Sequence, residues 1–493
     1  MELKVKFLKW SAGIPVAMLN KKSAEKLGIN SNDRVLIKTI GKKPKSLSTV
    51  IGLVEKIVNK EQIGLSSEVR KTMNLRPGQK VDVNLAPNPK SLKYIKAKLI
   101  GNVFSEEQIF QIIKDLVSNS LSEAEVSLFI SAMHRQGMTL KETIFLINAM
   151  VKVGEKMTIR GKYVVDKHSI GGIPGNRTTP IVVSICATAG LKMPKNSSRA
   201  ITSAAGTADV IETLAKVEFS KKQLQSIIKK VGAFLVWEGP IGIVPADSKI
   251  IKIEKRLKID PKAQMIASIM SKKIAAGAKY ILIDIPCGKT AKTTRQGALS
   301  LKKKFEQIGR HFKKKIKVVL TDGSQPIGNG VGPVLEMRDV LDILDQNKKG
   351  PKDLEDKSIF LAGEIFEMVG KAKKGKGIEL AREILSSGKA FEKFKQIIKA
   401  QQGEVKELDL GKYKEDILAQ KNGKVLEISN TKINSLARAA GCPVDKSSGV
   451  YLHCKLGTRL KKGDKILTIY AETKSRLNQA IKFYKDEKPI LIR

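Results

Sequence analysis

The sequence has little of what several protein classes depend on. Of its 493 residues, 5% are aromatic, four are cysteine and four are histidine. The cysteines have no CxxC spacing and the histidines are dispersed, so we expect no metal site and a reducing, cytoplasmic compartment. No apolar run approaches the roughly 20 residues of a membrane span, and the N-terminus lacks the apolar core of a secretory signal. The cysteines are Cys186, Cys287, Cys442 and Cys454.

Negative charge is also scarce. Lysine and arginine number 91 against 48 aspartates and glutamates, which gives a formal net charge of +43. Only 16 of the cations are arginine, whereas base readout relies on the arginine fork and single-strand binding relies on aromatic stacking. An RNA- or polyanion-binding protein is therefore kept as an alternative, and nucleic acid is not the expected partner. The lysine runs 302–304 and 313–315 are predicted to solvate helices.

Residues 1–86 contain a near-repeat. The run LNKKSAEKLGINSNDRVLI from Leu19 matches LSSEVRKTMNLRPGQKVDV from Leu65 at a constant offset of 46. Each copy offers a polar N-cap candidate, Asn20 or Ser66, then a short helix, a turn and an alternating strand. This pattern predicts an N-terminal β-barrel domain made by duplication. Either oligomerisation or a passive appendage fits such a domain.

Beyond the barrel, the hydrophobic period becomes that of helices. Starts at Ser105, Ser122 and Leu140 predict a helical domain over 87–157, completed by about 246–277. Strands that alternate with helices then predict a central α/β phosphate-binding domain. Short strands separated by glycine-containing turns predict a C-terminal α+β domain. The fold class is thus multidomain α/β. The central domain is predicted over 158–245 and 278–410, with strands at 233–236, 280–285 and 317–320. A helical pattern at 263–276 lies between these two segments, in the part that completes the helical domain. The C-terminal domain is predicted over 411–493, with strands at 425–426, 449–453 and 465–470.

Residues suited to binding anions gather between Asp166 and Asp209. Two segments, DKHSIGGIPGNRTTP and PKNSSRAITSAAGTAD, flank an apolar helix at 181–189. Their glycines let backbone N–H groups approach an anion, and their lysine, serine and threonine side chains add donors. Two such segments predict two phosphate groups in one cleft, with a pair of Ser/Gly-rich turns as the alternative. The glycines at 328–332 depart from GxGxxG spacing and are predicted to form a connecting loop.

The motifs KHSIGGIPGN, SSRAITSAAGTAD, DPKAQMIASIMSKK and TDGSQPIGNGVGP, in that order, resemble the thymidine/pyrimidine-nucleoside phosphorylase family. The resemblance runs from about residue 100 to the C-terminus. The exact residues of these motifs and the additional N-terminal barrel are most similar to the archaeal branch of the family, the AMP phosphorylases. It implies that AMP and phosphate give adenine and ribose 1,5-bisphosphate, with CMP and UMP as further substrates. A pyrimidine-nucleoside (thymidine) phosphorylase is the alternative activity. Also implied are substrates bound between the helical and α/β domains, no cofactor besides the co-substrate phosphate, and a homodimer that assembles further through the N-terminal domain.

The same resemblance assigns residues by motif. His168 is expected to position groups rather than to act as an acid or base, and Lys272, one helical turn after Ser268, is expected at the base. The phosphate-binding residues would be Lys167, Ser169, Thr179, Ser197 and Thr207. The AMP-binding residues would be Gly172, Ser198, Arg199, Ala200, Ile201, Thr202, Ser203, Thr207, Ser268 and Lys292.

Asp260 matches the proton donor of the archaeal branch. Cleavage of an N-glycosidic bond places negative charge on the departing base, so the donor must be protonated, which requires burial or nearby anions. Asp260 also precedes Pro261 and Lys262 at a predicted helix start, so an N-cap role is an alternative that can coexist. The arginine with which pyrimidine enzymes reach the base has no secure match, and Arg256 nearby is predicted to be a solvated charge. Base preference therefore stays open.

Overall fold

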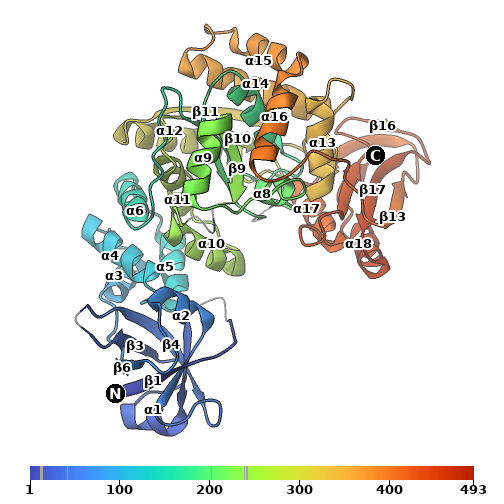
Figure 1. Cartoon of the computed structure of the whole chain (residues 1–493). Coiled ribbons are helices and arrows are strands. Elements are labelled where there is room, and N and C mark those ends of the chain that lie inside the picture. The colour runs from blue at the N-terminus through green and yellow to red at the C-terminus, as the bar shows by residue number, and fades with distance from the viewer. Residues whose placement is uncertain (12–14, 42, 201–202, 238, 240–241) are drawn as a thin grey trace. The chain divides into compact units, whose positions relative to one another are not determined.

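The structure is a computed structural model that describes residues 1–493 except 12–14, 42, 201–202, 238 and 240–241 (Figure 1). The chain divides into two compact units. The first unit comprises Met1–Gly154 and Val244–Ser271, and the second comprises Glu155–Ile243 and Lys272–Arg493. The finer division into four domains stays a prediction.

The chain begins with a closed barrel, as the sequence predicts, in the strand order β1-β5-β2-β4-β3-β6. Its strands alternate buried and exposed residues, so that aliphatic side chains fill the interior. The described elements are β1 (Glu2–Phe7), β2 (Val16–Asn20), α1 (Lys21–Leu27), β3 (Arg34–Thr39), β4 (Ser46–Val54), β5 (Gln62–Leu65), α2 (Ser67–Met73) and β6 (Lys80–Leu85).

The two predicted N-caps of the barrel differ. The Asn20 side chain accepts a hydrogen bond from the N–H of Lys22 at 3.1 Å, which caps α1. The Ser66 hydroxyl accepts the N–H of Val16 at 3.2 Å instead. Ser66 therefore precedes α2, as predicted, but links it to a strand rather than capping it.

Three helices of the first unit start where the sequence predicts. Capping boxes at Ser105, Ser122 and Thr139 satisfy the first backbone N–H groups of α4, α5 and α6. Within this unit α10 packs against α4 and α5. The helices are α3 (Ser91–Leu99), α4 (Glu106–Val117), α5 (Glu123–Gln136), α6 (Leu140–Lys152), α10 (Pro245–Leu257) and α11 (Lys262–Ala275), of which the last four residues belong to the second unit.

The second unit contains a parallel sheet in the order β11-β10-β7, which a bridge between Val164 and Lys192 links to β8-β9. Because these strands are parallel, their carboxyl ends meet at one edge, where open α/β sheets bind ligands. The buried helix α7 packs against α14 and α16. The strands are β7 (Val165–Ser169), β8 (Met193–Ser197), β9 (Ala233–Trp237), β10 (Tyr280–Cys287) and β11 (Lys315–Asp322). The helices are α7 (Thr178–Thr188), α8 (Thr207–Ile211), α9 (Lys221–Val231), α12 (Arg295–His311), α13 (Pro333–Leu344), α14 (Lys352–Val369), α15 (Gly377–Ser386) and α16 (Lys389–Ala400).

The C-terminal part adds sheets in the orders β12-β15-β17-β13 and β16-β14-β18, with α17 and α18 (Figure 1). The predicted strands near 425, 449–453 and 465–470 are present as β14, β15 and β17. The loop predicted at 328–332 contains β12, which pairs with β15 and ties this sheet to the α/β part. The elements are β12 (Gly330–Val331), β13 (Tyr413–Leu418), β14 (Gly423–Ile428), α17 (Asn430–Ala440), β15 (Gly449–Leu452), β16 (Arg459–Leu460), β17 (Lys465–Ala471), α18 (Lys474–Glu487) and β18 (Ile490–Ile492).

Candidate functional site

A buried lysine lies in the middle of the strand β7. Lys167 is 1% exposed, and its ammonium donates to Thr178 Oγ1 at 2.6 Å and to Thr179 Oγ1 at 3.4 Å. Burial lowers the pKa of Lys167 to about 7, although the nearby Asp284 carboxylate opposes the change. A bound anion would stabilise the charged form of this lysine, so the position suits a phosphate.

The opposite face of β7 carries a second charged cluster, because successive side chains of a strand point to opposite faces. Asp166 lies between two ammonium groups, 3.4 Å from Lys195 Nζ and 2.8 Å from Lys273 Nζ. All three side chains are buried. Burial lowers the pKa of Lys195, and burial together with Lys273 and Lys195 holds the pKa of His168 well below its usual range. His168 is therefore neutral at pH 7, next to a surplus of positive charge.

A glycine loop follows β7. A Cβ atom on Gly175 would lie 2.1 Å from the carbonyl oxygen of Ile327, and the φ angle there is +69°, so the position requires glycine. A Cβ atom on Gly172 would lie 3.2 Å from Lys292 Cβ. The loop thus brings together Gly172 and Lys292, both predicted to hold the nucleotide.

The second predicted segment follows β8. Ser197, the last residue of this strand, is buried, and its hydroxyl has no hydrogen-bond partner among the described residues. The side-chain amide of its neighbour Asn196 is likewise buried and unpartnered in that part of the chain. Parallel pairing places Ser169 and Ser197 at the same edge of the sheet, as their assignment to one phosphate requires.

The turn after Ser197 folds back on itself. Asp209 Oδ2 accepts the N–H groups of Ala200 and Gly206, both at 2.8 Å. A Cβ atom on Gly206 would lie 2.4 Å from the carbonyl oxygen of Ser198, and the Ser203 hydroxyl donates to the Ala205 carbonyl at 2.6 Å. The predicted residues Ile201 and Thr202 lie outside the described residues.

Arg199 makes its contacts with protein carboxylates. Its guanidinium holds Glu212 through two hydrogen bonds of 2.7 and 2.8 Å, contacts Asp209 at 3.2 Å and lies 4.6 Å from the Trp237 ring. Hydrogen bonding to Glu212 raises the pKa of Arg199 above its already high value. The charge that the sequence assigns to the nucleotide is thus already balanced within this turn.

The remaining predicted residues lie on or near α11. Asp260 precedes the first helical residue by two positions and is exposed. Ser268 is half-buried on the helix, in the first unit with Asp260, whereas Lys272 belongs to the second unit. Arg256 pairs with Glu123 at 2.5 Å and is 59% exposed, which agrees with a solvated charge.

Sequence reasoning missed most of the buried charges around the sheet. Their only local signal is a charged residue inside a strand, as at Asp166 and Lys195, because their partners lie far away in the chain. Asp284 is an example: burial alone would raise its pKa, but Lys357, Lys167 and Thr321 outweigh burial and lower it. The missed residues are Asp166, Arg177, Lys195, Lys273, Asp284, Glu336 and Lys357.

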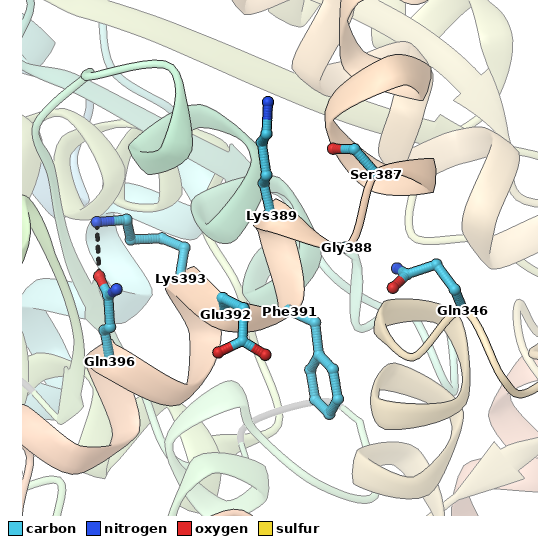
Figure 2. Close-up of a pocket in the computed structure, with 8 residues that line it drawn as sticks. All are labelled: Gln346, Ser387, Gly388, Lys389, Phe391, Glu392, Lys393 and Gln396. Carbon is cyan, nitrogen blue, oxygen red and sulfur yellow. Dashed lines mark hydrogen bonds between the residues drawn. The ribbon is translucent and has the colours of Figure 1, made fainter.

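A hollow of about 470 Å³ lies elsewhere in the second unit, where α16 begins. Figure 2 shows the residues that line it. Lys393 and Gln396, hydrogen bonded at 2.9 Å, lie on its wall with the ring of Phe391. None of its lining residues belongs to the predicted site. The part of the chain that the structure describes contains no group of three His, Cys, Asp or Glu side chains able to hold a metal ion, and no helix there is long and apolar enough to span a bilayer.

The sequence matches three family descriptions. Residues 92–154 match the glycosyl transferase family helical bundle domain, 161–391 the glycosyl transferase family a/b domain, and 424–490 the pyrimidine nucleoside phosphorylase C-terminal domain. The chain is 43% identical to the AMP phosphorylase of Pyrococcus furiosus and 42% identical to that of Thermococcus kodakarensis, in each case over 100% of this chain and 98% of the relative. The Methanococcoides burtonii AMP phosphorylase is 40% identical over 100% of this chain and 97% of its own. A crystal structure of anthranilate phosphoribosyltransferase from Thermus thermophilus, 19% identical, superposes with a TM-score of 0.53 over 63% of this chain and 99% of its own, which supports the fold alone.

Proposed function

The chain belongs to the AMP phosphorylases, relatives of the pyrimidine nucleoside phosphorylases, and on this premise we propose that it cleaves AMP with inorganic phosphate to adenine and ribose 1,5-bisphosphate. It is a pentosyltransferase that uses phosphate as a co-substrate and needs no cofactor. CMP and UMP are proposed as further substrates.

The observation that carries this proposal is the environment of Lys167. A buried ammonium that contacts hydroxyl groups rather than a carboxylate suits an anionic ligand. Phosphate held by Lys167, Ser169, Thr179, Ser197 and Thr207 would be positioned to attack the anomeric carbon as positive charge develops on the ribose. Little proton removal from phosphate is needed, which agrees with a positioning role for His168.

Asp260 is proposed to donate a proton to the departing adenine. The side chain is exposed, and only the protonated form of a carboxyl group can donate this proton. Ser268 and Lys272 are proposed to contact the base. Gly172, the run 198–203, Thr207 and Lys292 are proposed to hold the nucleotide, with the Arg199 side chain shaping the turn through its carboxylate partners.

Product analysis tests the reaction directly. Incubation of the full-length protein with AMP and phosphate is expected to release free adenine and a bisphosphorylated ribose. Adenosine and thymidine are the matched substrates, because each lacks the 5′-phosphate. Turnover of only these nucleosides would refute the nucleotide assignment and favour the pyrimidine-nucleoside alternative.

The barrel is proposed to have arisen by duplication and to extend a homodimer into larger assemblies. The β2-α1-β3 and β5-α2-β6 runs start 46 residues apart at each element, which supports the duplication. Light scattering of the full chain and of a variant without residues 1–86 tests the assembly. The same number of protomers per particle in both would contradict the proposed role of the barrel. Free thiols on all four cysteines agree with the proposed cytoplasmic location.

A further inference from the structure

Arg177 connects three segments of the second unit. This residue immediately precedes α7 and is 7% exposed. Its guanidinium donates to the Glu336 carboxylate, to the carbonyl oxygen of Ala205 and, at 3.2 Å, to Thr207 Oγ1. Arg177 thus spans the start of α7, the turn before α8 and the start of α13.

The direction of the contact with Thr207 matters. A guanidinium group only donates hydrogen bonds, so the Thr207 oxygen accepts, and its own hydrogen must point elsewhere. The Thr178 and Thr179 hydroxyls likewise accept hydrogen bonds from Lys167, since an ammonium group also only donates. A hydroxyl group whose oxygen accepts a hydrogen bond from a cation can still donate its own hydrogen to another group. Phosphate oxygens bind such donors.

Glu336 fixes the position of Arg177. This carboxylate is 1% exposed and accepts the N–H of Gly332 at 3.1 Å in addition to Arg177 Nε. Burial raises the pKa of Glu336, whereas Arg177 favours its charged form. Each charge therefore depends on the other, and the guanidinium plane has little freedom to turn away from Thr207.

We infer that Arg177 is a positioning residue for anion binding: held by Glu336, it orients the Thr207 hydroxyl as a hydrogen-bond donor to inorganic phosphate. The inference rests on the proposed function for the identity of the anion. It goes beyond the motif assignments, which include Thr207 but neither Arg177 nor Glu336.

A purely structural role for Arg177 makes different predictions. An arginine that only links three segments would affect stability, whatever residue stands at 207. An arginine that acts through Thr207 affects phosphate binding only while the Thr207 hydroxyl is present. Binding of inorganic phosphate to the full-length protein, measured by titration calorimetry, separates the two roles without relying on turnover.

The variants are Arg177→Ala, Thr207→Val, Thr207→Ser and the double variant Arg177→Ala/Thr207→Val. We expect Arg177→Ala and Thr207→Val each to raise the Kd for phosphate by about tenfold or more. The double variant should bind phosphate no more weakly than the weaker-binding of the two single variants, because both changes remove the same hydrogen-bond donor. Thr207→Ser, which keeps the hydroxyl, should stay within about threefold of the unmodified chain.

A matched control comes from the first unit. Arg34 also forms a largely buried pair, with Glu125 at 2.6 Å, and contacts none of the predicted site residues. Arg34→Ala should lower the melting temperature but leave the phosphate Kd within about twofold. Guanidinium ion, added to Arg177→Ala well below denaturing concentration, should lower the raised Kd by refilling the site.

The outcomes separate cleanly. Multiplying effects in the double variant, an Arg177→Ala Kd within about twofold of the unmodified chain, or no response of that folded variant to guanidinium would overturn the positioning role. Phosphate binding without AMP cleavage would refute the proposed function but leave these titrations to decide the role of Arg177. Absence of phosphate binding by the unmodified chain would overturn both.

Discussion

Buried lysines have different partners in the two units. In the first unit, Lys98 pairs with Glu142 at 2.7 Å, and the carboxylate also accepts the N–H of Phe104. In the second unit, Lys167 faces two threonine hydroxyls, while Lys195 and Lys273 share Asp166. Burial of a charge without its own counter-charge costs free energy. The first arrangement is complete in itself, whereas the second becomes balanced when an anion binds.

Removal of Lys167 should have the largest effect on function. Lys167→Met deletes the buried charge while keeping a similar volume, so phosphate affinity and the rate of phosphorolysis should each fall by about 100-fold to 1,000-fold. Stability should stay the same or rise, because an apolar side chain replaces a desolvated ammonium. Phosphate titration and thermal unfolding measure the two effects. Normal saturation by phosphate would contradict the assignment.

Asp260→Asn tests whether an exposed carboxyl group of the first unit takes part in the chemistry. Turnover should fall by about 100-fold or more, because asparagine cannot donate the proton to the departing base. The KM for AMP should change little, since the lost interaction matters in the transition state. Steady-state kinetics measure both, with the exposed Asp486→Asn on α18 as the control. Unchanged turnover would leave only the N-cap role.

Lys98→Met should reverse the pattern of Lys167→Met. The change leaves the Glu142 carboxylate buried without its ammonium partner, so the free energy of unfolding should drop by about 3–5 kcal/mol. Phosphate affinity should remain unchanged. Denaturant unfolding and phosphate titration of the same samples measure the contrast. Equal losses of phosphate affinity in Lys98→Met and Lys167→Met would abolish the distinction between the two units.

Local signals in the sequence predict much of the fold. The capping boxes at Ser105 and Ser122 mark α4 and α5, because a cap and its partner lie three residues apart. The apolar strand β9 was equally recognisable from its run of large hydrophobic residues. Such features depend only on neighbouring residues, so one sequence suffices to predict them.

The site could be predicted only in part. The glycine loops and Lys167 stand out by composition and by resemblance. The strand β7, with the sequence VDKHS, lacks the apolar run that is typical of a buried strand. Its polar side chains can be buried because they pair with residues far away in the chain, as Asp166 does with Lys195. Arg177 and Glu336 lie 159 residues apart, so no local pattern relates them. The exposure of Asp260 likewise depends on tertiary packing.

The pH dependence of stability should differ between Lys167→Met and the unmodified chain. The pKa of Lys167 is about 7 when folded, far below that of a free lysine, so the unfolded chain binds more protons above pH 7. Burial of Lys167 is therefore most unfavourable at and below pH 7 and is relieved toward pH 10. The stability advantage of Lys167→Met should shrink by about 2 kcal/mol between pH 7 and pH 9. Urea unfolding at both values measures it, and a constant difference would contradict the assigned pKa.

Neutralisation of surface lysines should have the smallest effect, and it tests whether the net charge of +43 itself matters. Lys26 on α1 and Lys303 on α12 are exposed, one in each unit. Lys26→Gln and Lys303→Gln should each leave the phosphate Kd within about twofold and the free energy of unfolding within about 0.5 kcal/mol. A general positive field can still speed the approach of AMP and phosphate, but salt screens that effect. Stopped-flow association at low and high salt would reveal this effect on the association rate. A phosphate Kd that rises severalfold in either variant would show that the surface charge contributes to binding.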